Sequence, residues 1–186
     1  RNYFNNFFDF NESIDNKNIL ILGYGEISKF LVSKLKHFNN KISIVVYKRA
    51  KKKINGINKI YTINQIDKAF EKNNMVINLF SENINTFEII NIKLLKKLPK
   101  YSSLINVSRG DIVKNVDLIR FLNLNKTFIY ASDVFSRKEY VNPYKPLDYN
   151  SKLLKLNRVI ISPHIGAVSK EFWNMQLELF SKNLKL

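Results

Sequence analysis

The chain has 186 residues, of which 45% are hydrophobic, and this is enough for one domain with a sizeable core. It contains no cysteine, so disulfides and cysteine-ligated metals are excluded, and we predict no metal site. No apolar run approaches the roughly 20 residues that cross a bilayer, so a helical membrane protein is not expected. The lack of cysteine fits a reducing compartment, and we expect a cytoplasmic protein.

The formal net charge of +16 has two interpretations. A strongly basic surface could bind nucleic acid or another polyanion. The alternative is a lysine- and asparagine-rich composition spread along the whole chain, with one dense basic run at residues 48–53. The scattered lysines favour the second interpretation, so we do not expect a nucleic-acid partner.

Short apolar runs alternate with segments of helical periodicity along the chain. Residues 1–17 are polar and aromatic without a clear period, and we expect a linker that enters a domain spanning residues 18–186. Strands are predicted at residues 19–22, 42–47, 59–63, 75–79, 103–107, 128–134 and 159–162. Several of these runs are apolar almost throughout, as is typical of parallel strands covered on both faces. We therefore predict an α/β fold, a Rossmann-like doubly wound parallel sheet of about seven strands with helices on both faces.

Helices are predicted between these strands. Ile27, Leu31, Leu35 and Phe38 have the spacing of one helical face, which we expect to be the buried one. Asn64 is the expected cap of a helix at residues 65–72. Further helices are expected at residues 92–98, where Asn91 is the cap, and at 116–122 and 168–184. The last of these carries Val168, Phe172, Met175 and Leu179 at helical spacing, which favours core or interlobe packing over a cofactor contact.

The first predicted strand runs directly into Gly23, Tyr24 and Gly25. Gly23 would permit a tight turn and Gly25 would let the backbone approach a diphosphate. The helix that begins near Glu26 and Ile27 would point its unpaired N–H groups at that charge. Ser28 stands where the usual pattern has a third glycine, and it is small enough to replace it. This turn indicates either a dinucleotide site or an ordinary connection between a strand and a helix.

The second predicted strand ends near Lys48 and Arg49. A carboxylate at this point typically holds the ribose 2′-hydroxyl of NAD, whereas a basic pair can bind the 2′-phosphate of NADP. The local charge therefore favours NADP(H) over NAD(H). A solvated cationic loop and a nucleotide site that has lost its function are the alternatives.

Three later stretches carry a family resemblance: residues 104–113 (LINVSRGDIV), 131–135 (ASDVF) and 161–166 (ISPHIG). In order and spacing they resemble the nucleotide-binding domain of the D-isomer-specific 2-hydroxyacid dehydrogenases. That family includes glyoxylate/hydroxypyruvate reductases, phosphoglycerate dehydrogenases and the C-terminal-binding-protein corepressors. The resemblance extends from about residue 18 to residue 167, most of the chain.

The resemblance implies roles for individual residues. Arg109 matches the family arginine that holds the substrate carboxylate and keto oxygen, a task for a planar and permanently charged group. His164 matches the acid/base that protonates the keto oxygen, which suits an imidazole whose unperturbed pKa is about 6.5. Ordinary structural roles, a surface arginine at a strand end and a hydrogen-bonded histidine, are the alternatives for both.

The expected partner of the histidine is displaced in this chain. The family places a glutamate shortly after Asp-Val-Phe to hold the imidazole. Here Glu139 stands one residue later than in the family, and tyrosine replaces the proline that usually follows. A one-residue insertion in the loop would restore Glu139 to its role. Otherwise Lys138 occupies that place, and its charge would lower the pKa of His164.

The resemblance also implies a cofactor wall and a missing partner lobe. Asp133 would lie near the nicotinamide carboxamide, and the wall would further include Thr86, Val107, Ser108 and Gly166. The family's Pro-Leu-Thr after the fourth strand is absent, because residues 80–83 read Phe-Ser-Glu-Asn. Family enzymes have a second, substrate-binding lobe that is largely absent from these residues.

These observations predict an NAD(P)-dependent oxidoreductase that transfers hydride between a nicotinamide cofactor and a 2-keto or 2-hydroxy acid. The resemblance also implies a homodimer. A nucleotide-sensing pseudoenzyme of the corepressor type is the alternative, favoured by the displaced glutamate and the altered glycine turn. The presence of both Arg109 and His164 favours the enzyme.

Overall fold

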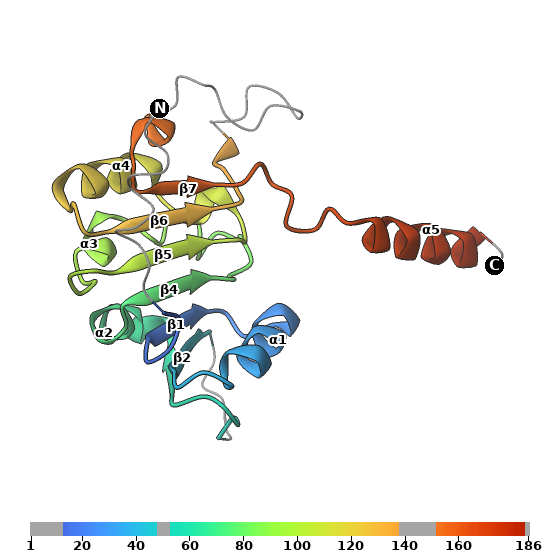
Figure 1. Ribbon diagram of the computed structural model, residues 1–186, viewed down its shortest axis with the longest axis horizontal. Helices are drawn as coiled ribbons and strands as arrows, with labels where there is room; N and C mark the ends of the chain where they lie inside the picture. The colour runs from blue at the N-terminus through green and yellow to red at the C-terminus, as the bar shows by residue number, and fades with distance from the viewer. Residues whose placement is uncertain (1–12, 48–52, 138–151, 185–186) are drawn as a thin grey trace.

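A computed structural model describes residues 13–47, 53–137 and 152–184. It contains a seven-stranded sheet in the order β3-β2-β1-β4-β5-β6-β7 (Figure 1). All neighbouring strands are parallel. The strands are β1 (Asn18–Leu22), β2 (Lys41–Val46), β3 (Lys59–Thr62), β4 (Met75–Asn78), β5 (Ser103–Asn106), β6 (Ile129–Ser132) and β7 (Val159–Ile161). Each predicted apolar run forms a strand, and the Rossmann-like fold is confirmed.

Alternate residues of the strands enter two separate cores, because successive side chains of a strand point to opposite faces. Leu20 and Leu22 belong to the larger core, which is completed by α2 (Ile66–Lys72), α3 (Ile92–Leu95) and α4 (Asn115–Leu124). Ile19 and Ile21 belong to the smaller core, which is covered by α1 (Glu26–Leu35). Helices therefore pack on both faces of the sheet, as expected.

The first helix buries only part of the predicted face: Leu35 is buried and Leu31 packs against the smaller core, as predicted. Ser28, Val32 and Leu35 are its buried residues, whereas Ile27 is 70% exposed. Phe38 lies beyond the end of α1 and is 40% exposed. The buried face is therefore centred on Ser28, Val32 and Leu35. The apolar spacing alone did not place Ser28 and Val32 on the buried face.

Two other boundaries differ from the predictions. Asn64 does not cap the second helix, because it lies inside a 3-10 turn η2 (Ile63–Gln65) that precedes α2. Gln65 is the N-cap of α2, and Thr62 is the N-cap of η2, where it forms a capping box with Gln65. Asn91 does cap α3, where its side chain accepts hydrogen bonds from the amides of Lys93 and Leu94. α3 is shorter than predicted and ends at Leu95.

The final helix α5 (Lys170–Leu184) extends away from the sheet (Figure 1). None of its residues is buried, and Trp173, Leu177 and Phe180 are each more than half exposed. The predicted apolar stripe is therefore not part of this domain's core. Packing of α5 against a second lobe stays a prediction. Among the described residues, no helix has both the length and the apolar character needed to cross a membrane.

Two short turns complete the architecture, η3 (Gly110–Ile112) after β5 and η5 (Leu153–Lys155) before β7. Because all strands are parallel, their carboxyl ends lie along one edge of the sheet, the edge at which α1 begins and the chain leaves β7 (Figure 1). In folds of this kind, ligands bind beyond that edge.

Candidate functional site

The glycine turn after β1 has one tightly packed glycine and one open one. The amide of Gly23 donates to the carbonyl of Val45 at 2.9 Å. Gly23 has a φ of +94°, and a Cβ there would lie 2.9 Å from the carbonyl oxygen of Leu79. Gly25, in contrast, has an extended backbone and nothing within 4 Å of the position of a Cβ. Gly23 thus permits the turn, and Gly25 leaves space above it.

The N-terminus of α1 opens onto that space. Gly25 is the N-cap of α1 and makes no side-chain cap, so the first-turn amides keep their capacity for an external acceptor. Glu26 is exposed and forms an ion pair with Lys29 at 2.5 Å, which compensates its charge. Ser28 is buried, and its hydroxyl has no hydrogen-bond partner among the described residues. These residues fit a diphosphate group on the turn.

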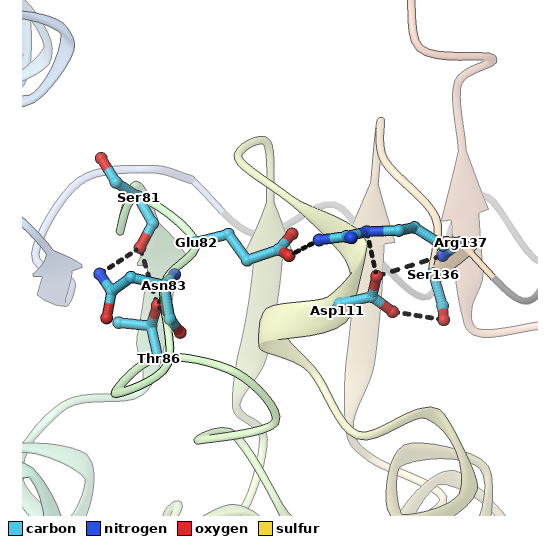
Figure 2. A network of polar contacts seen from close by, with 7 residues as sticks. All are labelled: Ser81, Glu82, Asn83, Thr86, Asp111, Ser136 and Arg137. Atoms are coloured by element: carbon cyan, nitrogen blue, oxygen red, sulfur yellow. Dashed lines mark hydrogen bonds and ion pairs between the residues drawn. The ribbon is translucent and has the colours of Figure 1, made fainter.

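The loop after β4 is held by its own polar contacts (Figure 2). Thr86 is fully buried, and its hydroxyl donates to the carbonyl of Ser81 at 2.8 Å while it accepts from the amide of Asn83 at 2.8 Å. Thr86 therefore shapes this loop from inside. The ring of Tyr47, at the end of β2, lies 5.8 Å from the ring of Phe80. Tyr24, in the glycine turn, packs against the core beneath α1.

Two buried asparagines that we did not predict connect this loop with the next one. Asn78 and Asn106 are the last residues of β4 and β5, are paired in register, and are fully buried. The amide of Asn78 donates to Oδ1 of Asn106 at 2.9 Å. Asn78 accepts from the amide of Phe80, and Asn106 accepts from the amide of Ser108. The signal for this pair in the sequence was an asparagine at the end of each of two mainly apolar strands.

Arg109 follows β5 in the same edge. Its backbone carbonyl accepts from the side chain of Asn106 at 3.1 Å, which fixes the turn. Its guanidinium is exposed and donates to the carbonyl of Ser108 at 2.8 Å. Ser108 donates its hydroxyl to the carbonyl of Phe80, and the neighbouring Val107 is 46% exposed. The arginine is thus accessible on a turn that is bonded to the β4 loop.

Asp133, directly after β6, builds the turn that carries His164. Its carboxylate accepts from the hydroxyl of Ser162 at 2.6 Å and from the amides of Ile165 and Gly166 at 3.0 and 2.8 Å. Burial raises the pKa of Asp133, but these hydrogen bonds and the nearby His164 lower it more, so the pKa lies below its usual value. A Cβ on Gly166 would lie 2.8 Å from this carboxylate, so the close approach requires glycine.

His164 occupies an unusual backbone conformation. Its φ is +57°, in the left-handed region that residues other than glycine rarely adopt, and the residue is exposed. Its amide donates to the carbonyl of Ser162 at 3.0 Å. Non-glycine residues are held in this conformation only where the surroundings enforce it, often at functional sites. Here the hydrogen bonds that Ser162, Ile165 and Gly166 donate to Asp133 supply that constraint.

The parallel sheet therefore places the Gly23–Gly25 turn, the β4 loop, Arg109, Asp133 and His164 along one edge. Three predicted residues, Lys48, Arg49 and Glu139, lie outside the described residues. Their roles stay predictions.

Comparison with known proteins identifies the family. Residues 4–166 match the family described as D-isomer specific 2-hydroxyacid dehydrogenase, NAD binding domain. The chain belongs to this family. A glyoxylate reductase of Pyrococcus horikoshii is 29% identical over 168 residues, which are 90% of this chain and 47% of that protein. Glyoxylate/hydroxypyruvate reductase A of Escherichia fergusonii is 30% identical over 150 residues, 81% of this chain and 45% of that protein.

Solved structures of dehydrogenases share the fold. The apo form of D-mandelate dehydrogenase from Rhodotorula graminis has a TM-score of 0.77 and 17% identity, covering 93% of this chain and 48% of that one. A probable 2-hydroxyacid dehydrogenase from Rhizobium etli, in complex with NADP, HEPES and L(+)-tartaric acid, has a TM-score of 0.71 and 24% identity, covering 90% and 53%. The chain spans about half the length of the proteins that it matches.

Proposed function

We propose that this chain is the nucleotide-binding half of an NAD(P)-dependent oxidoreductase that interconverts a small 2-keto acid and its 2-hydroxy acid. The observation that carries the proposal is the position of Arg109, after β5, and His164, after β7, on the same edge of the sheet where the Gly23–Gly25 turn opens. Membership of the family and the names of the relatives, several of which are glyoxylate reductases, support the same reaction.

Each residue has a defined task in this proposal. The first-turn amides of α1 would hold the diphosphate of the dinucleotide, and the bound cofactor would supply the hydride for reduction of the keto acid. Arg109 presents a planar cation that binds the substrate carboxylate and stabilises negative charge on the keto oxygen. His164 donates a proton to that oxygen in the reducing direction and accepts it in the reverse direction. Asp133 acts on His164 by holding the turn in position.

We further propose that Lys48 and Arg49 select NADP(H) over NAD(H). Both follow β2, whose carboxyl end lies beside that of β1 and hence beside the glycine turn. Two cations at this place would attract the 2′-phosphate of NADP(H). The double variant Lys48→Asp, Arg49→Ala should bind NADPH at least 10-fold more weakly and NADH no more weakly than the wild type. Equal NADPH affinity in both proteins would exclude this role.

The main experiment is a turnover assay with the full-length protein. NADPH or NADH oxidation should be detectable with glyoxylate or hydroxypyruvate, and His164→Ala should abolish it without weakening nucleotide binding in calorimetry. Tight nucleotide binding by the wild type without turnover of any 2-keto acid would instead support a nucleotide-sensing module of the corepressor type.

Two further expectations belong to this proposal. We expect the full-length protein to form a homodimer, and its sedimentation would test that expectation. A cytoplasmic location also stays a prediction, and fractionation of the source cells would test it.

A further inference from the structure

A group of ionic contacts outside the residues assigned so far crosses the carboxyl edge from the β4 loop to the segment after β6 (Figure 2). The carboxylate of Asp111 accepts from the hydroxyl of Ser136 at 2.5 Å and from the amide of Arg137 at 3.3 Å. Nε of Arg137 lies 3.2 Å from the same carboxylate. The guanidinium of Arg137 also pairs with Glu82 of the β4 loop.

The backbones beneath these contacts are packed against each other. A Cβ on Gly110 would lie 1.9 Å from the carbonyl carbon of Phe135 and 2.3 Å from the nitrogen of Ser136. Asp111 and Ser136 are both buried. The turn that begins at Arg109 therefore packs directly against residues 135–137. Asp111 stabilises this packing through charge-assisted hydrogen bonds.

Residues 135–137 also lead back to the turn of His164. They follow Asp133 within four residues, and Asp133 holds the amides of Ile165 and Gly166. A series of hydrogen bonds and backbone links thus runs from the Arg109 turn through Asp111 to residues 133–137 and on to the turn of His164. The guanidinium of Arg137 compensates part of the negative charge of Asp111 and Glu82, while that of Arg109 is directed to the carbonyl of Ser108.

We propose that Asp111 is a positioning residue, which sets the spacing between Arg109 and His164 by holding residues 136 and 137 against the Arg109 turn. This inference rests on the proposed function, because Arg109 and His164 must act on one substrate for their spacing to matter. Loss of the Asp111 carboxylate would loosen both turns while leaving the glycine turn at β1 unaltered. A small displacement of binding groups is costly for catalysis, since the reacting groups must be aligned.

The test compares Asp111→Ala and Asp111→Asn in the full-length protein. Asp117→Ala is the matched control, because Asp117 also binds a backbone amide, that of Ile92 at 3.0 Å, but lies on α4. We expect Asp111→Ala to lower kcat/KM for glyoxylate at least 10-fold, with the nucleotide Kd within about twofold of the wild type. Asp111→Asn should recover part of the loss, because its amide oxygen still accepts from Ser136.

Hydrogen exchange measured by mass spectrometry gives a readout that does not depend on turnover. Asp111→Ala should speed exchange in peptides covering residues 133–137 and 162–168, and leave residues 18–35 unchanged. Unchanged exchange at 162–168, the same pattern in Asp117→Ala, or a wild-type kcat/KM in Asp111→Ala would each overturn the proposal. A wild type that turns over no 2-keto acid would refute the proposed function, and the exchange result would still decide whether Asp111 links the two turns.

Discussion

Replacing Gly25 by alanine should weaken nucleotide binding without destabilising the fold. The backbone of Gly25 is extended, with a φ of −91°, and any residue adopts this conformation. A Cβ there would have nothing within 4 Å. Gly23 is the matched position two residues earlier, where φ is +94° and a Cβ would lie 2.9 Å from the carbonyl oxygen of Leu79. Alanine at position 23 should therefore destabilise the fold, whereas alanine at position 25 should leave it intact.

The expected magnitudes follow from that geometry. At Gly25, alanine would stabilise the protein by reducing the conformational entropy of the unfolded chain, whereas its weaker N-cap preference would destabilise it. These effects oppose each other, so the free energy of unfolding should change by less than about 1 kcal/mol. At Gly23, the left-handed backbone and the contact with Leu79 should cost about 1–3 kcal/mol of stability. A methyl group at Gly25 that meets a bound diphosphate should cost about 1–3 kcal/mol of binding, or about 5- to 150-fold in Kd.

The assay is isothermal calorimetry with NADPH and NADH, together with urea unfolding of each variant. Gly25→Ala should unfold like the wild type and bind the nucleotide more weakly, and Gly25→Val should bind it more weakly still. Wild-type affinity in both Gly25 variants would show that the nucleotide does not approach this turn. Unaltered stability of Gly23→Ala would refute the argument from the backbone conformation.

Three other predictions concern the opposite end of the site and α5. His164→Asn should keep its Tm within about 2 °C, because asparagine tolerates a positive φ, but should lower turnover about 100-fold or more; near-normal turnover would exclude a proton-transfer role. Burial raises the pKa of Asp133, but its hydrogen bonds lower it by more, so the folded-state pKa lies below the unfolded-state value of about 3.9. The wild type should therefore be more stable than Asp133→Asn, and this advantage should be complete above the unfolded-state pKa. That advantage should vanish as pH falls through the lower folded-state pKa, and a difference in urea midpoints that is independent of pH would contradict it. Removal of residues 170–186 should shift the Tm by less than about 2 °C, since no α5 residue is buried, and a loss of more than about 5 °C would reveal packing that the structure does not contain.

The fold could be predicted because its signals are local and repeated. Each strand is a short apolar run, and β1, for example, contains four consecutive residues with no exposed surface. Alternation of such runs with helical segments leaves few topologies other than a parallel sheet. The positions of Arg109, Asp133 and His164 after successive strands then followed, since parallel strands end at one edge.

The details that the sequence left open depend on contacts between distant residues. The face that α1 buries includes the small polar Ser28, which a pattern of apolar residues does not predict. The second helix begins after Gln65 and not after Asn64, because a 3-10 turn precedes that helix. The pairing of Asn78 with Asn106 requires β4 and β5 to be neighbours in register.

The sequence by itself determined the strands, their class of sheet and the order of the candidate catalytic residues, because these depend on hydrophobic periodicity and on short local motifs. Only the tertiary structure decided that Asp133 builds the turn of His164 and that Arg137 joins Asp111 to Glu82. Those partners are 26 to 55 residues apart in the chain. Their meeting depends on the order of the strands in the sheet, which no local pattern encodes.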